Sequence, residues 1–568
     1  MKKTYKIIFP LLIISMSFLG WSLTDLHLSR HLFFTTENTT CRKSAGILEP
    51  VPPDDYASAN QYKINVLHYF INIDLRPEEK MLKGDVVITG AFLDKNISQI
   101  DLNFYDNMKI YLLLLNGKTS SFTEKGTRLS IPLSGIQPDT FEVRVLYEGT
   151  PKRAGFSSFV FGEINGKSCI YNLSEPNYAS TWLPCNDIPS DKALLDMEIT
   201  NDSSEVSASN GKLVSITTSG SRRTYYWKTI YPVSTYLICL YSSSYINFSD
   251  KYISQDKADT MAIEYYVFPK QLENAKVDFQ DLPEMIGFFS KTFGEYPFIK
   301  EKYGIAEFLW QFGAMETQTL MGIGSNFIGG ENFFTEIYIH ELAHHWFGDA
   351  VGPASWKDIW LNEGFATYCE ALYAEHVGGS GALRSSMMSK LGVFDGTVYN
   401  PKDLFSHTVY EKGAWILHLL RHETGDSVFF KILRNYYESY KYKSASTKDF
   451  ENVCEKVSGK NLSSFFEQWV FIGSGIINLD YSWKPNKSSN NCNITLNVDQ
   501  TQTEYDTYNF PLDMKILFND YTTEYRTIRI NKRQNILNLE FSKEPLEITL
   551  DPDNWLPARI QYIKNGSE

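Results

Sequence analysis

One short stretch constrains this chain more than any other. It begins at His340 and reads HELAHHWFGDAVGPASWKDIWLNEGF. His340 and His344 are four residues apart, so on a helix they lie one turn apart on the same face. Two neutral imidazoles at that spacing can bind one zinc ion, and Glu341 is then placed to accept a proton from a zinc-bound water.

A catalytic zinc ion needs a third protein ligand, because such sites have three ligands and one open position. Glu363, within Asn362-Glu363-Gly364, follows His344 by nineteen residues, on what the pattern indicates is the next helix. We therefore predict one zinc ion bound by His340, His344 and Glu363. The alternative is an ordinary amphipathic helix whose histidines are hydrogen-bonded within a core.

Length, charge and the absence of other motifs argue against several other classes of protein. The 568 residues are enough for three or four domains, and the formal net charge of -13 argues against nucleic acid as a partner. The sequence contains no P-loop, no dinucleotide-binding glycine motif and no GxSxG nucleophile elbow. No rival chemistry therefore competes with the zinc site.

The N-terminus has the form of an export signal. Three lysines precede an apolar run from Ile7 to Leu23, which is typical of a secretory signal and also reaches the short limit for a membrane span. We predict a signal peptide or membrane anchor over 1–23 and a linker over 24–60. The protein is then expected in the periplasm, outside the cell, or tethered to a membrane through residues 7–23.

Hydrophobic periodicity divides the remainder into three domains. Residues 61–255 alternate with a period of two, which predicts an N-terminal antiparallel β saddle or sandwich. Over 256–477 apolar residues recur at spacings of three and four, which predicts a mainly helical domain. The period of two returns over 478–568, where we expect a C-terminal β-sandwich. The fold class is thus multidomain α+β.

Two segments of the central stretch carry a resemblance to a known family. HELAHHWFG and WLNEGFATY resemble the zinc aminopeptidases of the aminopeptidase N family, which also contains leukotriene hydrolase. The resemblance covers roughly residues 61–568 and implies a thermolysin-like catalytic domain with one zinc ion. It also implies that the substrates are peptides with a free N-terminus.

A third segment resembles the family's Gly-x-Met-Glu-Asn strand. It comprises Gly313, Ala314, Met315 and Glu316, and the glutamate lies 24 residues before His340. The resemblance implies that the backbone of this strand pairs with the peptide and that Glu316 binds the free α-amine. A carboxylate at a fixed distance from the zinc ion would select the first peptide bond for hydrolysis. This chain has Thr317 where asparagine is commoner.

The resemblance implies two further site residues. Glu175 precedes a segment that resembles the family's Pro-Cys motif, and it occupies the position of a residue that reaches into the active site. Tyr410 begins Tyr410-Glu411-Lys412-Gly413, where the family has a tyrosine that donates a hydrogen bond to the developing oxyanion. The alternatives are a solvated loop carboxylate and a surface tyrosine.

The sequence therefore predicts a zinc metalloaminopeptidase in which Glu341 activates a zinc-bound water. Three alternatives are distinct. A thermolysin-type endopeptidase would not need Glu175 or Glu316, and blocking the substrate's N-terminus would distinguish it. An enzyme with the two activities of leukotriene hydrolase would carry an amide in place of Glu175. The third alternative is a catalytically silent binding scaffold.

Overall fold

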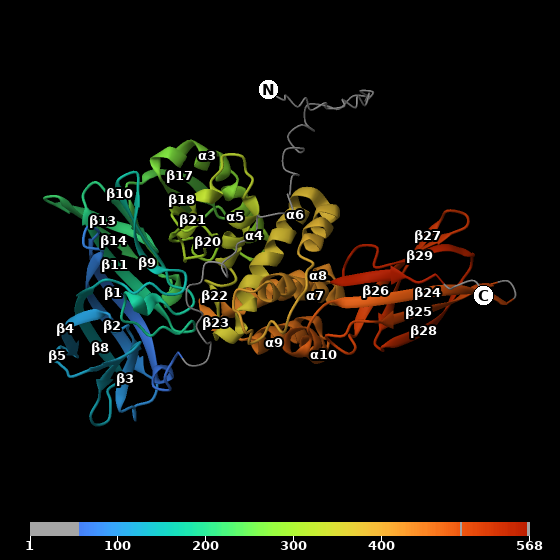
Figure 1. The fold of residues 1–568 in the computed structure, drawn as a ribbon, viewed down its shortest axis with the longest axis horizontal. Helices are drawn as coiled ribbons and strands as arrows, with labels where there is room; N and C mark the ends of the chain where they lie inside the picture. Colours follow the sequence, from blue (N-terminus) through green and yellow to red (C-terminus); the bar gives the residue numbers. More distant parts are fainter. Residues whose placement is uncertain (1–55, 489–490, 565–568) are drawn as a thin grey trace, which may run out of the picture.

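The computed structural model describes residues 56–488 and 491–564. Three parts follow one another along the long axis of the molecule: a β domain, a helical domain and a second β domain (Figure 1). The predicted signal or anchor segment, 1–23, and most of the predicted linker lie outside the described residues. Among the described helices, none is long and apolar enough to cross a membrane.

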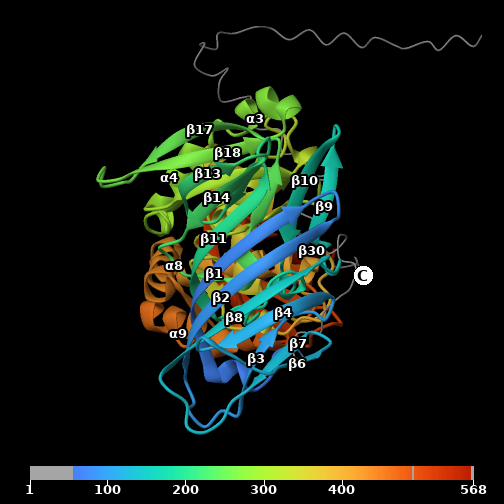
Figure 2. The same ribbon diagram turned by 90° about the vertical axis from the view of Figure 1, so that its left-hand side faces the viewer.

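The N-terminal domain is built around one large twisted sheet (Figure 2). Tyr69, Ile71, Ile73 and Leu75 are buried as the alternation predicts. The sheet contains nine strands in the order β13-β14-β11-β1-β2-β8-β4-β5, with β15 beside β11. Their bounds are β1 Ile64–Arg76, β2 Met81–Phe92, β4 Met108–Leu115, β5 Lys118–Thr119, β8 Thr140–Gly149, β11 Lys192–Asp202, β13 Lys212–Ser219, β14 Arg222–Lys228 and β15 Val233–Ser234.

One pair of strands departs from the antiparallel prediction. β1 and β11 are parallel, with Tyr69 opposite Leu195, whereas the other pairs in this sheet are antiparallel. Alternation reports which face of a strand is buried and carries no information on the direction of its partner. Two smaller sheets complete the domain: β3 Gln99–Asn103, β6 Thr123–Lys125 and β7 Arg128–Pro132, then β9 Ser158–Ile164, β10 Lys167–Leu173, β12 Val206–Ser209 and β16 Leu240–Ser243.

The central domain begins with a five-stranded sheet in the order β17-β18-β19-β21-β20. β17 lies before residue 256, yet it pairs with β18 in this sheet. The sheet of the central domain therefore starts about ten residues earlier than the change of period indicates, because β17 itself alternates. The bounds are β17 Ile246–Ile253, β18 Thr260–Val267, β19 Lys302–Phe308, β20 Ala314–Met315 and β21 Met321–Gly324, with β22 Val351–Pro353 and β23 Lys443–Ala445 forming a separate pair.

Helices make up most of this domain. The α-helices are α3 Leu272–Asp278, α4 Leu282–Phe293, α5 Thr335–His344, α6 Trp360–Ser389, α7 Gly413–Thr424, α8 Asp426–Tyr440, α9 Thr447–Ser458 and α10 Ser463–Phe466. Two π-helical segments are η7 Thr408–Lys412 and η8 Glu467–Ile472. Short 3-10 helices in this domain are η4 Pro269–Gln271, η5 Ser325–Phe327 and η6 Trp356–Asp358, and those in the N-terminal domain are η1 Gln61–Lys63, η2 Ala179–Thr181 and η3 Thr235–Leu237.

The C-terminal domain is a sandwich of two sheets. One sheet has the order β28-β25-β24-β30 and the other β27-β26-β29. The alternation in β26 buries every second residue from Phe510 to Phe518, as expected for a strand with one face against a core. The bounds are β24 Ile477–Ser488, β25 Asn491–Gln500, β26 Phe510–Phe518, β27 Thr523–Ile530, β28 Gln534–Phe541, β29 Pro545–Leu550 and β30 Ala558–Tyr562.

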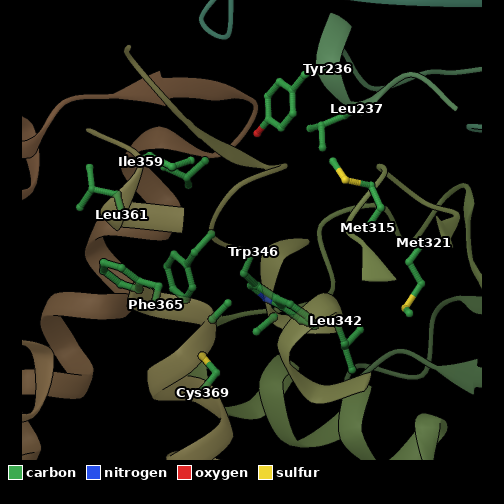
Figure 3. Close-up of a cluster of buried hydrophobic side chains, with 14 of the residues drawn as sticks. Tyr236, Leu237, Met315, Met321, Leu342, Trp346, Ile359, Leu361, Phe365 and Cys369 are labelled. Carbon is green, nitrogen blue, oxygen red and sulfur yellow. The ribbon is translucent and has the colours of Figure 1, made fainter. Parts of the chain in front are cut away.

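The hydrophobic core beneath α5 and α6 draws on both of the first two domains. Leu342 of α5 and Phe365 of α6 lie in one cluster with Met315 of β20 (Figure 3). Tyr236 and Leu237, from the 3-10 helix η3 of the N-terminal domain, lie in the same cluster. The elements that carry the predicted zinc ligands are therefore fixed by packing across the domain boundary.

Candidate metal centre and active site

The three predicted ligands meet at one point. Nε2 of His340 and Nε2 of His344 each lie 3.2 Å from Oε2 of Glu363. The histidines are on α5 and the glutamate on the first turn of α6. The three side chains are at most 3% exposed. The i, i+4 spacing in the sequence thus places both rings on the face of α5 that looks toward α6.

Each histidine is oriented by a hydrogen bond from its other ring nitrogen. Nδ1 of His340 lies 2.8 Å from Oε1 of Glu370, and Nδ1 of His344 lies 3.2 Å from the carbonyl oxygen of Phe347. The second oxygen of Glu370 accepts a hydrogen bond of 2.7 Å from the ammonium group of Lys390. A proton on each Nδ1 leaves each Nε2 able to offer a lone pair to a bound metal ion.

The charge of the centre favours a cation. Burial alone would lower the pKa of His340, but the hydrogen bonds to Glu363 and Glu370 outweigh it and raise the pKa to about 10. The buried carboxylates thus hold a proton on this ring when no metal ion balances their charge. A divalent cation would replace that proton and neutralise the same carboxylates.

These residues fit a zinc ion. Two nitrogens and one carboxylate oxygen are the donor set of many catalytic zinc sites, and ligands about 2.0–2.1 Å from a tetrahedral ion lie roughly 3.3 Å apart. The observed separations of 3.2 Å agree with that value. Histidines that bind zinc commonly hydrogen-bond to a carboxylate through the ring nitrogen that does not face the metal, and His340 makes this contact with Glu370.

Three more carboxylates surround the ligands. Ligand atoms of Glu316, Glu341 and His344 all lie within 4.8 Å of one another, and so do those of Glu175, Glu316 and Glu363. All five of these residues have no exposed surface. The structure therefore brings Glu175 to the metal centre, although it lies far away in the sequence and in a different domain.

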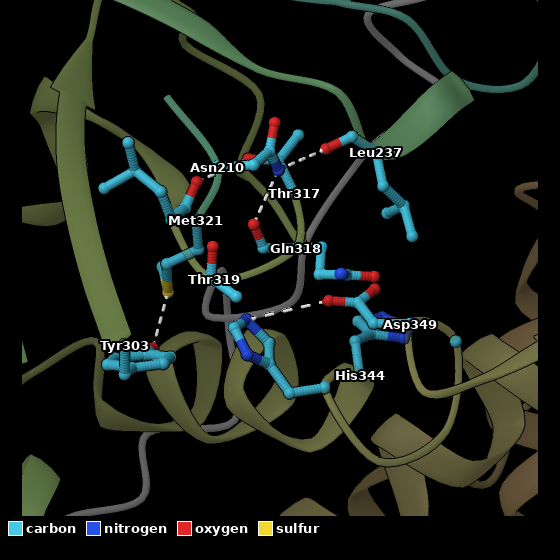
Figure 4. A network of polar contacts seen from close by, with 12 residues as sticks. Asn210, Leu237, Tyr303, Thr317, Gln318, Thr319, Met321, His344 and Asp349 are labelled. Atoms are coloured by element: carbon cyan, nitrogen blue, oxygen red, sulfur yellow. Dashed lines mark hydrogen bonds and ion pairs between the residues drawn. The ribbon is translucent and has the colours of Figure 1, made fainter. Parts of the chain in front are cut away.

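The strand that carries Glu316 is held by the N-terminal domain. β20 includes Ala314 and Met315, directly before the glutamate, and pairs with β21. The side-chain amide of Asn210 donates hydrogen bonds to the carbonyl oxygens of Gln318 and Leu237, at 2.6 and 2.9 Å (Figure 4). The loop after Glu316 is thereby tied to a domain that contributes no metal ligand.

Thr317 is accommodated without loss of the strand. Its hydroxyl donates to the carbonyl oxygen of Leu320 at 2.5 Å and lies 3.0 Å from the hydroxyl of Tyr241. The threonine thus forms a local turn contact with the backbone of Leu320. With threonine at position 317, ligand atoms of Glu316 and His344 lie within 4.8 Å of each other.

Two lysines form hydrogen bonds between the domains, one from the N-terminal domain to the catalytic domain and one from the catalytic domain to the N-terminal domain. Lys192 of β11 donates to the carbonyl oxygens of Asp349 and Ala350, just after α5. Lys302 of β19, which is buried, donates to the carbonyl oxygens of Ser209 and Gly211 in the N-terminal domain. The loop that follows the metal-binding helix and the adjoining sheet are therefore both hydrogen-bonded to the N-terminal domain.

Tyr410 lies beside the ligands because two helices meet backbone to backbone. Its ring is stacked on that of His340, with 5.8 Å between ring centroids and 9° between planes. A Cβ atom on Gly364 of α6 would come within 2.8 Å of Cα of Gly413, at the start of α7. Only glycines allow this approach, which draws the η7 segment with Tyr410 against the helix that carries Glu363.

The metal-site motifs gave no direct sign of Glu370, Lys390 or Asn210. Glu370 follows Glu363 by seven residues, so two helical turns place both on one face of α6, and that spacing is a usable signal. Lys390 and Asn210 carry no such signal. Among histidines, only His340 and His344 belong to the groups of potential metal ligands in the described residues.

Comparison with known proteins gives the same assignment. Residues 65–237 match the peptidase M1 N-terminal domain, and residues 278–469 match the peptidase family M1 domain. The chain belongs to peptidase family M1. Zinc is the metal of this family's solved neighbours, such as the M1 zinc metallopeptidase from Deinococcus radiodurans, which is 27% identical. That structure superposes with a TM-score of 0.64 and covers 72% of this chain and 93% of its own.

Other relatives are similar to this chain over only part of their own length, or in fold alone. Aminopeptidase N of Lactococcus lactis subsp. lactis is 27% identical over 71% of this M1 peptidase and 50% of its own length. Probable aminopeptidase 2 of Sulfurisphaera tokodaii is 28% identical over 59% and 46%. This chain thus spans about half the length of the curated relatives it matches. Aminopeptidase A of Legionella pneumophila shares the fold over 91% of this chain, with a TM-score of 0.79 at 19% identity.

Proposed function

We propose that this M1 peptidase is a zinc-dependent aminopeptidase that hydrolyses the N-terminal peptide bond of peptides. One observation carries the proposal: the carboxylates of Glu175 and Glu316 lie beside Glu363, a metal ligand. A buried pair of carboxylates next to the metal centre favours a substrate whose cationic α-amine is adjacent to the bond that is cut. The names of the curated relatives support the same reaction class.

The residues divide the chemistry among them. When bound to His340, His344 and Glu363, zinc supplies a Lewis acid that polarises the scissile carbonyl and lowers the pKa of a water to about 7. Glu341 accepts a proton from the attacking water and later donates it to the leaving amine. The Tyr410 hydroxyl donates a hydrogen bond to the oxygen on which negative charge develops, and losing one such donor typically costs about 2.7–4 kcal/mol.

The proposal predicts a selective defect when Glu316 is replaced. Hydrogen bonds to charged groups contribute roughly 1.5–3 kcal/mol, and about 1.4 kcal/mol corresponds to a tenfold change. We expect Glu316→Ala to lower kcat/KM for a free-amine peptide by about tenfold to a hundredfold. Steady-state assays on matched peptides would measure this, and zinc content should be unchanged because Glu316 is not a ligand.

The control is the same peptide with an acetylated N-terminus. It has no ammonium group, so wild type should hydrolyse it poorly and Glu316→Ala should lower its kcat/KM little further. Efficient internal cleavage of acetylated peptides by the wild type would contradict the proposal and favour a thermolysin-type endopeptidase.

We further propose that the protein acts outside the cytoplasm. The support is the sequence alone: lysines at 2, 3 and 6 precede the apolar run over 7–23. Cell fractionation should recover the chain outside the cytoplasm, either as a processed soluble form or with the membrane. Recovery of cytosolic protein that retains Met1 would refute this.

A further inference from the structure

A buried lysine lies two residues after Tyr410 in the chain. Lys412 is 3% exposed and ends the five-residue π-helical segment η7 that contains the tyrosine. Within the part of the chain that the structure describes, its amine forms no ion pair with a carboxylate, and burial lowers the pKa of this amine to about 7. A buried amine without a counter-ion is costly to a fold. Stability alone therefore does not account for a lysine at this position.

The amine of Lys412 is bound by two backbone carbonyl groups from separate segments. It donates hydrogen bonds to the carbonyl oxygen of Gly396 at 3.0 Å and to that of Gly473 at 2.5 Å. Gly396 belongs to the loop between α6 and η7, and Gly473 directly follows η8. The last side chain of η7 thus fixes this segment to two points outside it.

The two carbonyl groups hold their positions because their segments are hydrogen-bonded to each other. The N–H group of Gly396 donates to the hydroxyl of Ser474 at 2.9 Å, and the N–H group of Gly475 donates to the carbonyl oxygen of Phe394 at 2.8 Å. The hydroxyl of Tyr508, in the C-terminal domain, donates to the carbonyl oxygen of Ser474 at 2.9 Å. The two segments therefore form one connected support that extends to the C-terminal domain.

A second side chain fixes the other end of η7 to the same loop. The hydroxyl of Thr408 donates to the carbonyl oxygen of Asp395 at 2.9 Å. Tyr410 lies midway between Thr408 and Lys412, so the segment is bound on both sides of the tyrosine. Single π-helical turns are rare and are frequent at functional sites. Binding both ends of this turn determines where the tyrosine side chain leaves the helix.

We propose that Lys412 is a positioning residue for Tyr410, whose hydroxyl it holds in line with the oxygen on which negative charge develops. The inference rests on the oxyanion role that the proposed function gives to Tyr410. Lys412 acts through the backbone of η7, by its hydrogen bonds to the two carbonyl groups. Misplacing a group by about 1 Å can cost about 10²-fold in rate, so small movements of η7 should be visible in the kinetics.

A double-mutant cycle tests the inference. Lys412→Met keeps an unbranched side chain but removes the hydrogen-bond donors. With Tyr410 in place, we expect kcat for a free-amine peptide to fall about tenfold to a hundredfold, with KM and zinc content unchanged, because the tyrosine acts on charge that develops only in the reaction step. In the Tyr410→Phe background the same substitution should lower kcat less than about twofold, since no hydroxyl remains to be misplaced.

A second variant and a matched control accompany the cycle. Thr408→Val keeps the shape of the side chain and removes the hydroxyl, so kcat should fall about threefold or more with Tyr410 in place and less than about twofold in the Tyr410→Phe background. The control is Lys302→Met, because Lys302 is also buried and donates to two backbone carbonyls, but at the boundary with the N-terminal domain. Any effect of this control on kcat should be the same factor in both backgrounds. Circular dichroism verifies that each variant is folded.

Two results would each overturn the inference. One is a folded, zinc-loaded Lys412→Met protein with the kcat of the wild type. The other is a fall in kcat by the same factor in both backgrounds, as a general loss of packing would produce. If Lys412→Met does not fold, the same two results for Thr408→Val decide the matter. Equal factors leave the oxyanion role standing, whereas full kcat in Tyr410→Phe alone would remove that role and the inference with it.

Discussion

Zinc is expected to be lost, and peptide hydrolysis with it, when His344 is replaced by Ala. Its Nε2 atom lies 3.2 Å from the Glu363 carboxylate, and the substitution removes one of the three donors that converge there. Changes to outer contacts of zinc ligands commonly lower metal affinity about 10–100-fold, so loss of a ligand itself should cost more than about 100-fold. Zinc analysis after dialysis, together with kcat/KM on a free-amine peptide, would measure both effects.

Glu370→Gln provides a graded control for this prediction. It keeps a hydrogen-bond acceptor for His340 while removing the charge that faces Lys390. Metal affinity should fall by no more than about 10–100-fold, and activity should return at saturating zinc. A His344→Ala protein that retains activity in the presence of a chelator would exclude the assigned metal site.

Replacing Glu341 with Gln is expected to abolish most turnover without loss of zinc. The substitution preserves size and polarity but removes the ability to accept a proton, and general acid–base catalysis contributes about 10²- to 10⁴-fold. We therefore expect kcat to fall by about 10²- to 10⁴-fold. The assay is steady-state hydrolysis by protein of verified zinc content.

Comparing the kinetics of Glu341→Gln with those of Glu316→Ala distinguishes a carboxylate that transfers a proton from one that binds the substrate's amine. Glu341→Gln should lower kcat with little change in KM, because the proton transfer occurs only in the reaction step. Glu316→Ala should affect free-amine substrates selectively. If Glu341→Gln lowered kcat less than about tenfold, another group would have to act as the base.

The metal ligands could be predicted because their geometry is local. His340 and His344 are brought together by the helical period alone, and the motif that contains Glu363 is short and specific. Glu175 and Glu316 could be predicted only from the family resemblance. Nothing in their own surroundings in the sequence indicates that they lie within 4.8 Å of Glu363.

Contacts between distant segments could not be predicted from one sequence. The parallel pairing of β1 with β11 joins strands separated by more than one hundred residues, and alternation is silent on strand direction. The approach of Gly364 to Gly413 depends on how α6 and α7 pack, since a glycine in a sequence does not state what it touches. The sequence contains many asparagines, and nothing in it distinguishes Asn210 from the others. Its hydrogen bond to Gln318 depends on how the two domains pack.

The lysines that cross this boundary bear on how such proteins can diversify. Lys192 donates hydrogen bonds to carbonyl groups of the catalytic domain, and Lys302 donates hydrogen bonds to carbonyl groups of the N-terminal domain. Backbone carbonyls are present in any sequence, but their positions depend on the fold of the partner domain. An N-terminal domain borrowed from another lineage would have to present the same carbonyls and a matching lysine. The two domains are therefore expected to be inherited as a unit, with recombination between them selected against.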